Sequence, residues 1–190
     1  MKIIDATLAV VSGLMVGMVA GSFFQSWRVI GFFWVAFPVF SLVFLEIAYV
    51  VGRRALFVLQ AAKHLLVGAF ATVVDVIFFE WLLSVVFLAN PLIIKSISFL
   101  VSTVIKYAGN KYWAFEKRER EGMHKEAAQF FIITLAGLVI DVSVFYCATK
   151  LVGPRFNVSS LAWVRLSVIF AAFAAAAWNF LGYKFLVFKK

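Results

Sequence analysis

The sequence predicts an all-α membrane protein with six transmembrane helices. Its 190 residues are 65% hydrophobic and only 14% charged, and their mean hydropathy is +1.02. A soluble domain is nearer half apolar and a quarter charged, so this chain lacks the polar surface that a water-facing globule needs. The apolar residues also fall in long runs, which is typical of helices that cross a bilayer.

Six apolar runs mark the expected helices. A helix of about 20 apolar residues spans the hydrocarbon core, so six of them use roughly 120 positions and leave only short connections. No stretch outside the runs is long enough to form a separate soluble catalytic domain. The runs lie at about 6–24, 29–51, 64–88, 91–110, 128–149 and 160–182.

The first two runs are expected to form an N-terminal helical hairpin. Lys2 ahead of an apolar run is also a feature of signal peptides, but Asp5 interrupts the basic region and a second apolar run follows closely. Small residues recur every fourth position on one face of the first run, where they let helix backbones approach closely, within the chain or between chains. These residues are Gly13, Gly17 and Gly21.

The distribution of Lys and Arg predicts that both termini lie in the cytoplasm. Twelve basic residues flank the runs on the side of the N-terminus and five on the other side, and basic residues favour cytoplasmic loops. Lys106 is the exception, because it lies inside the fourth run. Membrane anchoring therefore accounts for the net charge of +9, and nucleic acid is not an expected partner.

The sizeable polar segment is 116–127, where Glu alternates with Lys and Arg. It divides the last four runs into two pairs, and we expect a solvated connector or a short interfacial helix there. The single cysteine, Cys147, excludes a disulfide within one chain. His64 and His124 lack the spacing of metal ligands, so neither a metal nor a cofactor is expected.

The two pairs of runs resemble each other in sequence. VVDVIFF at 73–79 matches VIDVSVF at 139–145, and GNKYWAF at 109–115 matches GYKFLVF at 182–188. The paired Asp and the paired Gly-x-Lys-aromatic features favour duplication over a chance match of apolar letters. Each unit contains two spans, so the copies would be parallel two-helix repeats, which tend to place a site at their interface. The expected organisation is a hairpin at 1–60 and a domain at 61–190, with repeat units at about 64–115 and 128–188.

Three features of the last four runs carry a family resemblance. They are Val67-Gly68 followed by Asp75, the segment 110–115 and the closing segment 179–184 with Phe188. In this order they resemble the GtrA-like family of small bacterial membrane proteins, over residues 64–190. Two positions depart from the family pattern, since Ala71-Thr72 replaces Asn-Thr and Trp113-Ala114-Phe115 replaces Trp-Thr-Phe.

The resemblance implies a role in cell-surface polysaccharide assembly, in the cytoplasmic (inner) membrane of a bacterium. Members of the family are associated with moving polyprenyl-phosphate-linked sugars across that membrane, beside a separate membrane glycosyltransferase. The implied partners are therefore a lipid-linked sugar, membrane lipids and a glycosyltransferase. Six spans are few for a complete pathway, so further copies of the chain are also expected partners.

Charged residues within spans are the first candidates for a functional site, because they are costly in a bilayer. Asp75 lies roughly 16 Å into its span at 1.5 Å per residue, and Asp141 lies at a similar depth. Lys106 can form an ion pair with Asp75 where their helices pack closely, and Asn179 is the candidate partner of Asp141. A structural pair that fixes helix register and a group used in transport are both open interpretations.

Two lysines at the cytoplasmic ends of spans complete the candidate set. Lys111 and Lys184 each lie among aromatic residues, and a lysine ammonium suits a lipid phosphate. The competing interpretation is an ordinary interface anchor. On the far side, Lys95 and Arg165 correspond and would receive the phosphate after it crosses. The candidate substrate-binding residues are Asp75, Lys106, Asn110, Lys111, Trp113, Asp141, Asn179 and Lys184.

Two functions are carried forward. The first is translocation of a polyprenyl-phosphate-linked sugar for polysaccharide synthesis or glycosylation. The second is a non-transporting scaffold that recruits or stabilises a glycosyltransferase. An enzyme is the least favoured class, because the sequence shows neither a DxD carboxylate pair nor a nucleophile beside a base.

Overall fold

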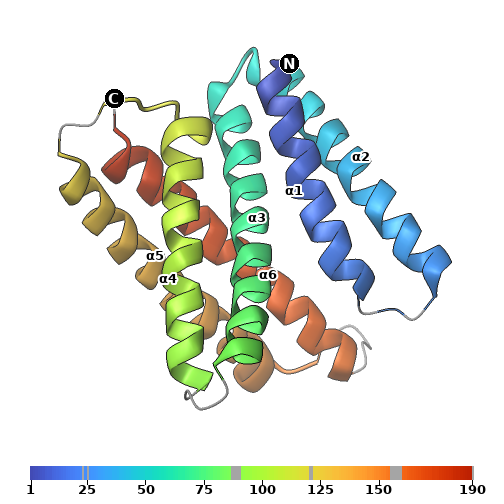
Figure 1. The fold of residues 1–190 in the computed structure, drawn as a ribbon. Coiled ribbons are helices and arrows are strands. Elements are labelled where there is room, and N and C mark those ends of the chain that lie inside the picture. Colours follow the sequence, from blue (N-terminus) through green and yellow to red (C-terminus); the bar gives the residue numbers. More distant parts are fainter. Residues whose placement is uncertain (23, 25, 87–90, 120–121, 155–159, 190) are drawn as a thin grey trace. The chain divides into compact units, whose positions relative to one another are not determined.

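The computed structural model describes residues 1–22, 24, 26–86, 91–119, 122–154 and 160–189, and it has no strand within these ranges. Within the described ranges, six α-helices follow one another along the chain, and three short π-helical segments extend some of them (Figure 1). The elements are α1 (Ile3–Ser22), α2 (Trp27–Gly52), α3 (Leu56–Val85), α4 (Pro91–Gly109), η1 (Asn110–Ala114), α5 (Met123–Tyr146), η2 (Cys147–Val152), α6 (Ser160–Gly182) and η3 (Tyr183–Val187).

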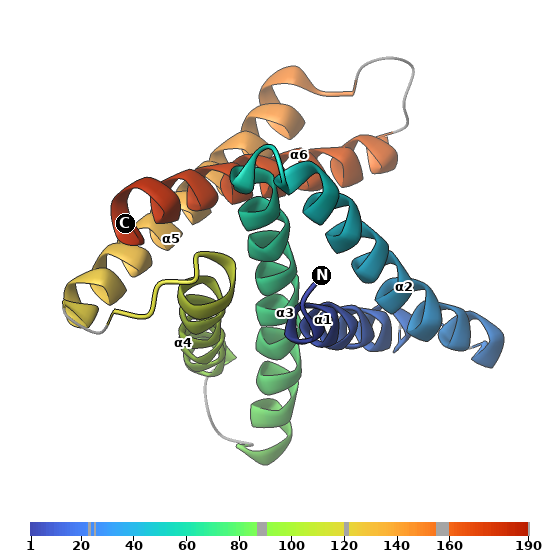
Figure 2. The ribbon, with the colours of Figure 1, turned by 90° about the horizontal axis from the view of Figure 1, so that it is seen from above.

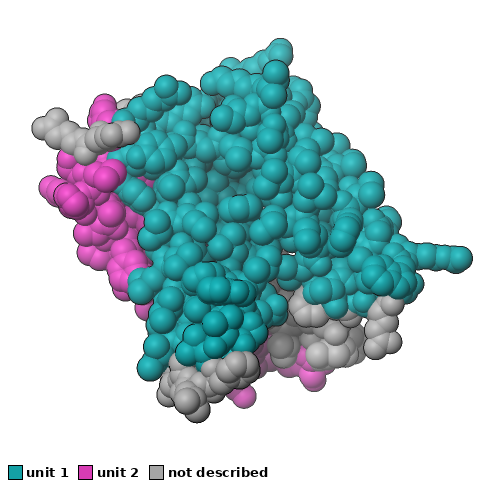
Figure 3. Space-filling model, viewed as in Figure 1, with its two compact units in different colours: residues 1–118 teal, residues 119–190 magenta. Residues whose placement is uncertain are grey.

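The helices form two compact units (Figure 3). Unit 1 is Met1–Arg118 and contains α1 to α4 with η1, whereas unit 2 is Glu119–Lys190 and contains α5, η2, α6 and η3. The boundary expected near residue 60 therefore falls inside unit 1. The polar segment 116–127 is non-helical as far as Glu119, and from Met123 onward it belongs to α5.

Five helical segments in the described part of the chain are long and apolar enough to cross a membrane. They are α1, α2, α3, Met123–Val152 and Phe170–Val187. The helix outside this set is α4, which has 19 residues and carries Lys106 in its last turn. The chain is thus a multi-pass helical membrane protein, as its composition predicts.

Glycines bring α1 and α2 together as an antiparallel hairpin (Figure 1). A Cβ added at Gly13 would lie 2.6 Å from the Cα of Pro38, and one added at Gly17 would lie 2.5 Å from the carbonyl oxygen of Phe33. Real Cβ atoms do not approach backbone so closely, so a larger residue at either position would push the two helices apart. The close packing predicted from the glycine spacing is confirmed, and it occurs within the chain.

The hairpin packs on α3, which lies between α1 and α4 in Figure 2. Ala9 of α1, Leu45 of α2 and Leu66 of α3 belong to one buried apolar cluster, and Trp113 of η1 packs against it. Burial of apolar area in this cluster joins the hairpin to the helices that follow. This packing explains why unit 1 extends across residue 60.

α3 begins at Leu56, well before the start expected at residue 64. The predicted run marked the apolar span, and the helix continues for eight residues ahead of it. Lys63 and His64 lie where the two meet, and both side chains are buried within the protein, with 2% and 3% of their surface exposed. Polar partners from other elements make this burial favourable, as described below.

Each unit ends its last long helix in a π-helical turn. The N–H of Phe115 donates to the carbonyl of Asn110 at 2.9 Å, and the N–H of Phe188 donates to that of Tyr183 at 2.7 Å. These are bonds between residues five apart, and π turns of this kind are often found at functional sites. The matching sequences around Gly109 and Gly182 therefore adopt the same local structure.

Candidate functional site

A buried group of charges lies at one end of unit 1. The ammonium of Lys63 is 3.2 Å from Asp5 Oδ1 and 3.1 Å from Glu116 Oε1. Lys63 and Asp5 expose only 2% and 1% of their side chains, whereas Glu116 is half exposed. A buried charge is strongly unfavourable unless it is paired and hydrogen-bonded, and here the two carboxylates supply that pairing.

Two aromatic side chains complete this group. The hydroxyl of Tyr49 donates to Asp5 Oδ2, and the indole N–H of Trp113 donates to Asp5 Oδ1 at 2.5 Å. The Lys63 ammonium also lies 5.9 Å and 5.8 Å from the centres of the Tyr49 and Trp113 rings. Hydrogen bonds to an ionised carboxylate are stronger than those between neutral groups. We call these five residues, Asp5, Tyr49, Lys63, Trp113 and Glu116, the ion cluster.

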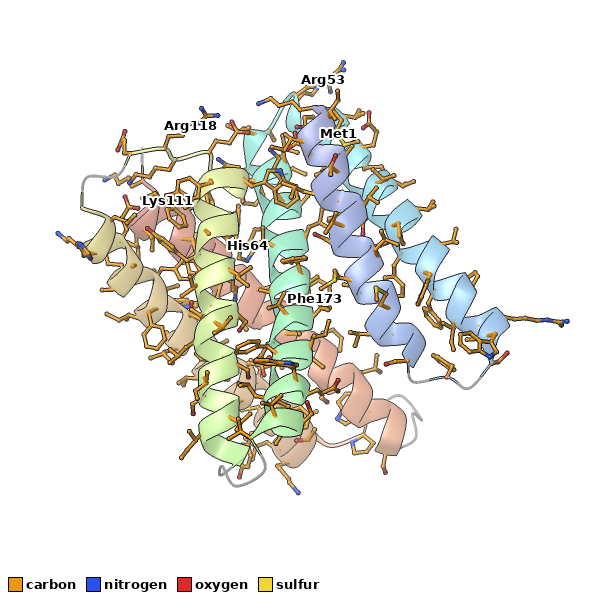
Figure 4. The ribbon with its side chains drawn as sticks, viewed as in Figure 1. Met1, Arg53, His64, Lys111, Arg118 and Phe173 are labelled. Atoms are coloured by element: carbon orange, nitrogen blue, oxygen red, sulfur yellow. The ribbon has the colours of Figure 1, made fainter. Side chains whose placement is uncertain are left out.

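The ion cluster joins elements that are far apart in the sequence. It takes residues from α1, α2, α3, η1 and the segment after η1, and Figure 4 shows Met1, Arg53 and Arg118 at the same end of unit 1. Of its members, Trp113 was a predicted site residue. The other four, Asp5, Tyr49, Lys63 and Glu116, were missed, although an acidic residue at the start of an apolar run and a lysine near a later run could have suggested a pair.

A second polar pair lies beside the π turn of unit 1. His64 Nδ1 is 2.7 Å from Asn110 Oδ1, and Asn110 Nδ2 donates to the carbonyl of Lys106 at 2.7 Å. Because the amide nitrogen is used as a donor, Oδ1 accepts and the proton lies on His64 Nδ1. Asn110 is fully buried, so the pair satisfies polar groups that water does not reach.

Lys111 is also fully buried. One interpretation of the sequence was that this lysine is an anchor at the membrane interface, at the end of its span. Its ammonium donates to the hydroxyl of Tyr107 at 3.4 Å and lies over the rings of Tyr107 and Tyr112, 5.8 Å and 5.9 Å from their centres. An interface anchor normally extends its charge into the headgroup region. The burial of Lys111 therefore favours an internal role over simple anchoring.

The mid-membrane residues of unit 1 correct one expected contact. Ser98 of α4 donates to Asp75 Oδ1 at 2.7 Å, which connects the half-buried carboxylate of α3 to the neighbouring helix. Among the described residues, Lys106 forms no ion pair with Asp75. Lys106 lies two helical turns beyond Ser98, or about 12 Å along α4, which places it nearer the end of the helix. The side chains of Lys95 and Arg165 lie outside the described part of the structure.

Unit 2 corrects the second expected contact. Asn179 of α6 packs against Gly137 of α5, where an added Cβ would overlap the amide group. Its Oδ1 is buried and accepts no hydrogen bond from any described residue. Gly137 lies one helical turn before Asp141, so the amide faces the turn next to the carboxylate. The contact that the structure gives the Asn179 amide is thus Gly137, in place of the expected partner Asp141.

Lys184 occupies the position in η3 that Lys111 occupies in η1. It is partly buried, and its ammonium lies 5.9 Å and 5.8 Å from the ring centres of Phe180 and Phe185. The preceding residue, Tyr183, is fully buried and donates its hydroxyl to Thr134 Oγ1 at 2.6 Å. η1 and η3 thus each place a lysine ammonium among aromatic rings.

An apolar cavity of about 290 Å³ lies within unit 1. It is close to the lower end of the volumes that bind small molecules. Residues of α1, α3, α4 and η1 line it: Leu8, Val11, Ser12, Val67, Phe70, Ile105, Ala108, Gly109 and Trp113. Trp113 belongs to the ion cluster as well, so one indole ring separates an apolar cavity from a group of charges.

The fold and these sites define a class: a multi-pass helical membrane protein with buried charges at the ends of its spans. Comparison with protein families is more specific, because the GtrA/DPMS transmembrane domain matches residues 63–188. The chain therefore belongs to the GtrA/DPMS transmembrane-domain family. Comparisons with curated proteins and with solved structures found no match. Membership of this family indicates a role in handling membrane-associated glycosyl carriers.

Proposed function

We propose that this chain moves the phosphate-bearing headgroup of a polyprenyl-linked sugar across a bacterial cytoplasmic membrane, without catalysing a chemical reaction. The observation that carries the proposal is the burial of Lys111 in η1. Lys111 offers a positive charge between two tyrosine rings, in a chain whose family handles glycosyl carriers. An ammonium suits a phosphate, and aromatic rings suit the apolar face of a sugar.

The proposed route uses polar groups at two depths of unit 1. Lys111 binds the phosphate near the end that we assign to the cytoplasm, with Asn110 and Trp113 of the same turn beside it. Asp75 with Ser98, and Lys106, provide polar groups deeper in the membrane. The prenyl tail stays in lipid, so the headgroup alone requires a path. Alternation between inward- and outward-open states would follow from unequal affinity of the substrate for the two states.

We also propose that residues 64–115 and 128–188 arose by duplication. Lys111 and Lys184 lie in matching π turns, and Gly109 packs on Val67 as Gly182 packs on Ile133. In this proposal Lys184, Asp141 and Asn179 of unit 2 are the counterparts of the headgroup-binding residues of unit 1.

The test is transbilayer movement of a prenyl-phosphate-linked glucose in proteoliposomes that contain only this chain. Lys111→Met keeps the length and the burial of the side chain but removes its charge, and Asp75→Asn removes the deeper carboxylate. We expect each change to lower the rate by at least about tenfold, which is about 1.4 kcal/mol of barrier. Lys117→Met is the matched control, because this lysine follows the π turn outside any helix. Full activity of the Lys111→Met and Asp75→Asn double variant would refute this mechanism.

A scaffold that binds a glycosyltransferase is the second candidate, and a carboxylate on the surface of α2 favours it. Glu46 is exposed next to Ile47 and Val50, about 9 Å before the end of the helix. Ionisable side chains in spans almost always face protein or water, so a partner helix that covers Glu46 would explain its position. Loss of glycosyltransferase copurification in Glu46→Leu, with normal movement of the lipid-linked sugar, would assign this face to the scaffold function.

A further inference from the structure

The backbone of Glu116 adopts an unusual conformation at the end of the π turn. Its φ angle is +51°, and it is the one residue other than glycine with a positive φ in the described ranges. The position just beyond a helix end commonly adopts this left-handed conformation, but glycine is the usual residue there because a Cβ is crowded. A glutamate at this position therefore indicates that its side chain is needed.

The side chain of Glu116 covers the buried lysine of the ion cluster. Its Oε1 is 3.1 Å from the ammonium of Lys63 and 3.9 Å from that of Lys2. Glu116 exposes 52% of its side chain and Lys2 exposes 68%, whereas Lys63 exposes 2%. The carboxylate is thus the accessible part of the cluster, and its displacement would open Lys63 to another anion.

The charges of the ion cluster and of the neighbouring Lys2 determine which anion fits. Lys2 and Lys63 carry two positive charges, and Asp5 and Glu116 carry two negative charges, so these four side chains have no net charge together. A phosphodiester carries one negative charge and several acceptor oxygens, so it can replace the Glu116 carboxylate without leaving a buried charge unbalanced. A diphosphate carries more negative charge and would not be balanced in this way.

The apolar cavity lies where the lipid part of such a molecule would extend. Trp113 donates to Asp5 within the ion cluster, and its ring also lines the cavity with Leu8 and Phe70. The nine residues that line the cavity provide an apolar surface, which suits an isoprene chain. A headgroup position with charge and an adjacent apolar cavity are the two parts that a prenyl phosphodiester requires.

We propose that Lys63 and Lys2 form the entry site for the phosphodiester of a prenyl-linked sugar, and that the Glu116 carboxylate occupies this site until the substrate displaces it. The first isoprene units then lie in the cavity beside Trp113. The choice of substrate rests on the proposed function, but the entry site concerns binding alone, so its affinity is measured without transport. The α1–α2 hairpin contributes both Lys2 and Asp5, although it precedes the matched family domain.

The experiment measures binding of a short-chain prenyl phosphodiester of glucose to the detergent-solubilised full chain by isothermal titration calorimetry. Glu116→Gln removes the charge, and Glu116→Gly also removes the crowded Cβ. We expect both variants to bind about tenfold more tightly than the wild type, which is within the usual range of coupling between a ligand and a competing contact. Glu119→Gln is the matched control, because this exposed carboxylate lies close in sequence and outside the cluster.

The lysines are tested in the Glu116→Gln background. Lys2→Gln changes an exposed side chain and should lower the affinity without affecting folding, and Lys63→Met should lower it further. Unchanged affinity in Glu116→Gln, or a gain in Glu116→Gly alone, would overturn the proposal, because the charge would then not be the competing group. Unchanged affinity in both lysine variants would overturn it as well.

Three further probes identify the ligand. Inorganic phosphate and a prenyl alcohol should each bind much more weakly than the phosphodiester, and a prenyl diphosphate should gain less from Glu116→Gln. Equal affinity for inorganic phosphate would identify a free-anion site and overturn the lipid assignment. If the wild type and Glu116→Gln bind as expected while no sugar crosses proteoliposomes, the entry site stands and the transport function fails.

Discussion

Removal of the Asp5 charge is the sharpest test of the ion cluster as a stabilising element. Asp5→Asn keeps the shape of the side chain, but it leaves Lys63 buried with one carboxylate instead of two. It also weakens the acceptor for Tyr49 and Trp113. Breaking a buried ion pair by removing one partner costs about 3–5 kcal/mol. Because Glu116 remains 3.1 Å from Lys63, we expect the lower end, about 3 kcal/mol.

The assay is thermal unfolding of the purified chain in detergent, followed by tryptophan fluorescence. A change of 1 kcal/mol shifts the Tm by about 2–4 °C in chains of this length, so Asp5→Asn should lower it by about 6–12 °C. Lys2→Gln is the control, because it removes the exposed and longer ion pair with Glu116. Such pairs contribute about 0–1 kcal/mol. A Tm loss in Asp5→Asn no larger than that of Lys2→Gln would refute this account of the cluster.

Two further predictions concern packing and a buried polar pair. Gly109→Ala should destabilise the fold by about 1–3 kcal/mol, because its Cβ would lie 2.8 Å from Val67 Cγ1. Gly68→Ala should instead stabilise the fold by about 0.5–1 kcal/mol, because no atom lies within 4 Å of the added Cβ. Equal Tm values for the two alanine variants would contradict the close contact. His64→Ala should cost about 1–3 kcal/mol in the same assay, because it leaves Asn110 Oδ1 buried without its donor. Adding Asn110→Leu should recover part of this loss, and a further loss instead would show that the pair is not what stabilises the turn.

The fold class follows from the sequence because membrane helices are defined by the length and polarity of their apolar runs. The ends of the helices are less well defined by these properties. The apolar run predicted a span from about residue 64 but not the extension of α3 back to Leu56, because hydropathy treats Lys63 as a surface residue, whereas Asp5 and Glu116 neutralise it inside the fold. A local apolar pattern gives no information on Asp5 and Glu116, which are more than fifty residues from Lys63 in the sequence.

For the candidate site too, the sequence predicts local segments better than it predicts contacts between helices. The matched motifs located Lys111 and Lys184, and the two matched segments adopt the same π-helical structure, in η1 and η3, which the sequence did not predict. The partners of the mid-membrane residues depend on how the helices are rotated and shifted against each other, which composition does not determine. Ser98 therefore binds Asp75 where Lys106 was expected, and Gly137 lies against Asn179 where Asp141 was expected.

The length of α3 makes the chain sensitive to the lipid around it. Its 30 residues measure about 45 Å, whereas the hydrocarbon core of a bilayer is about 30 Å thick. Lys63 lies about 10 Å from the start of this helix, near the level where hydrocarbon gives way to headgroups. Bilayers differ in thickness by several ångströms, so a thick one would bring acyl chains near the exposed Glu116 carboxylate, whereas a thin one would leave it among headgroups. If Glu116 yields its place to the substrate as proposed, the choice of lipid in a reconstitution would change how readily it leaves Lys63.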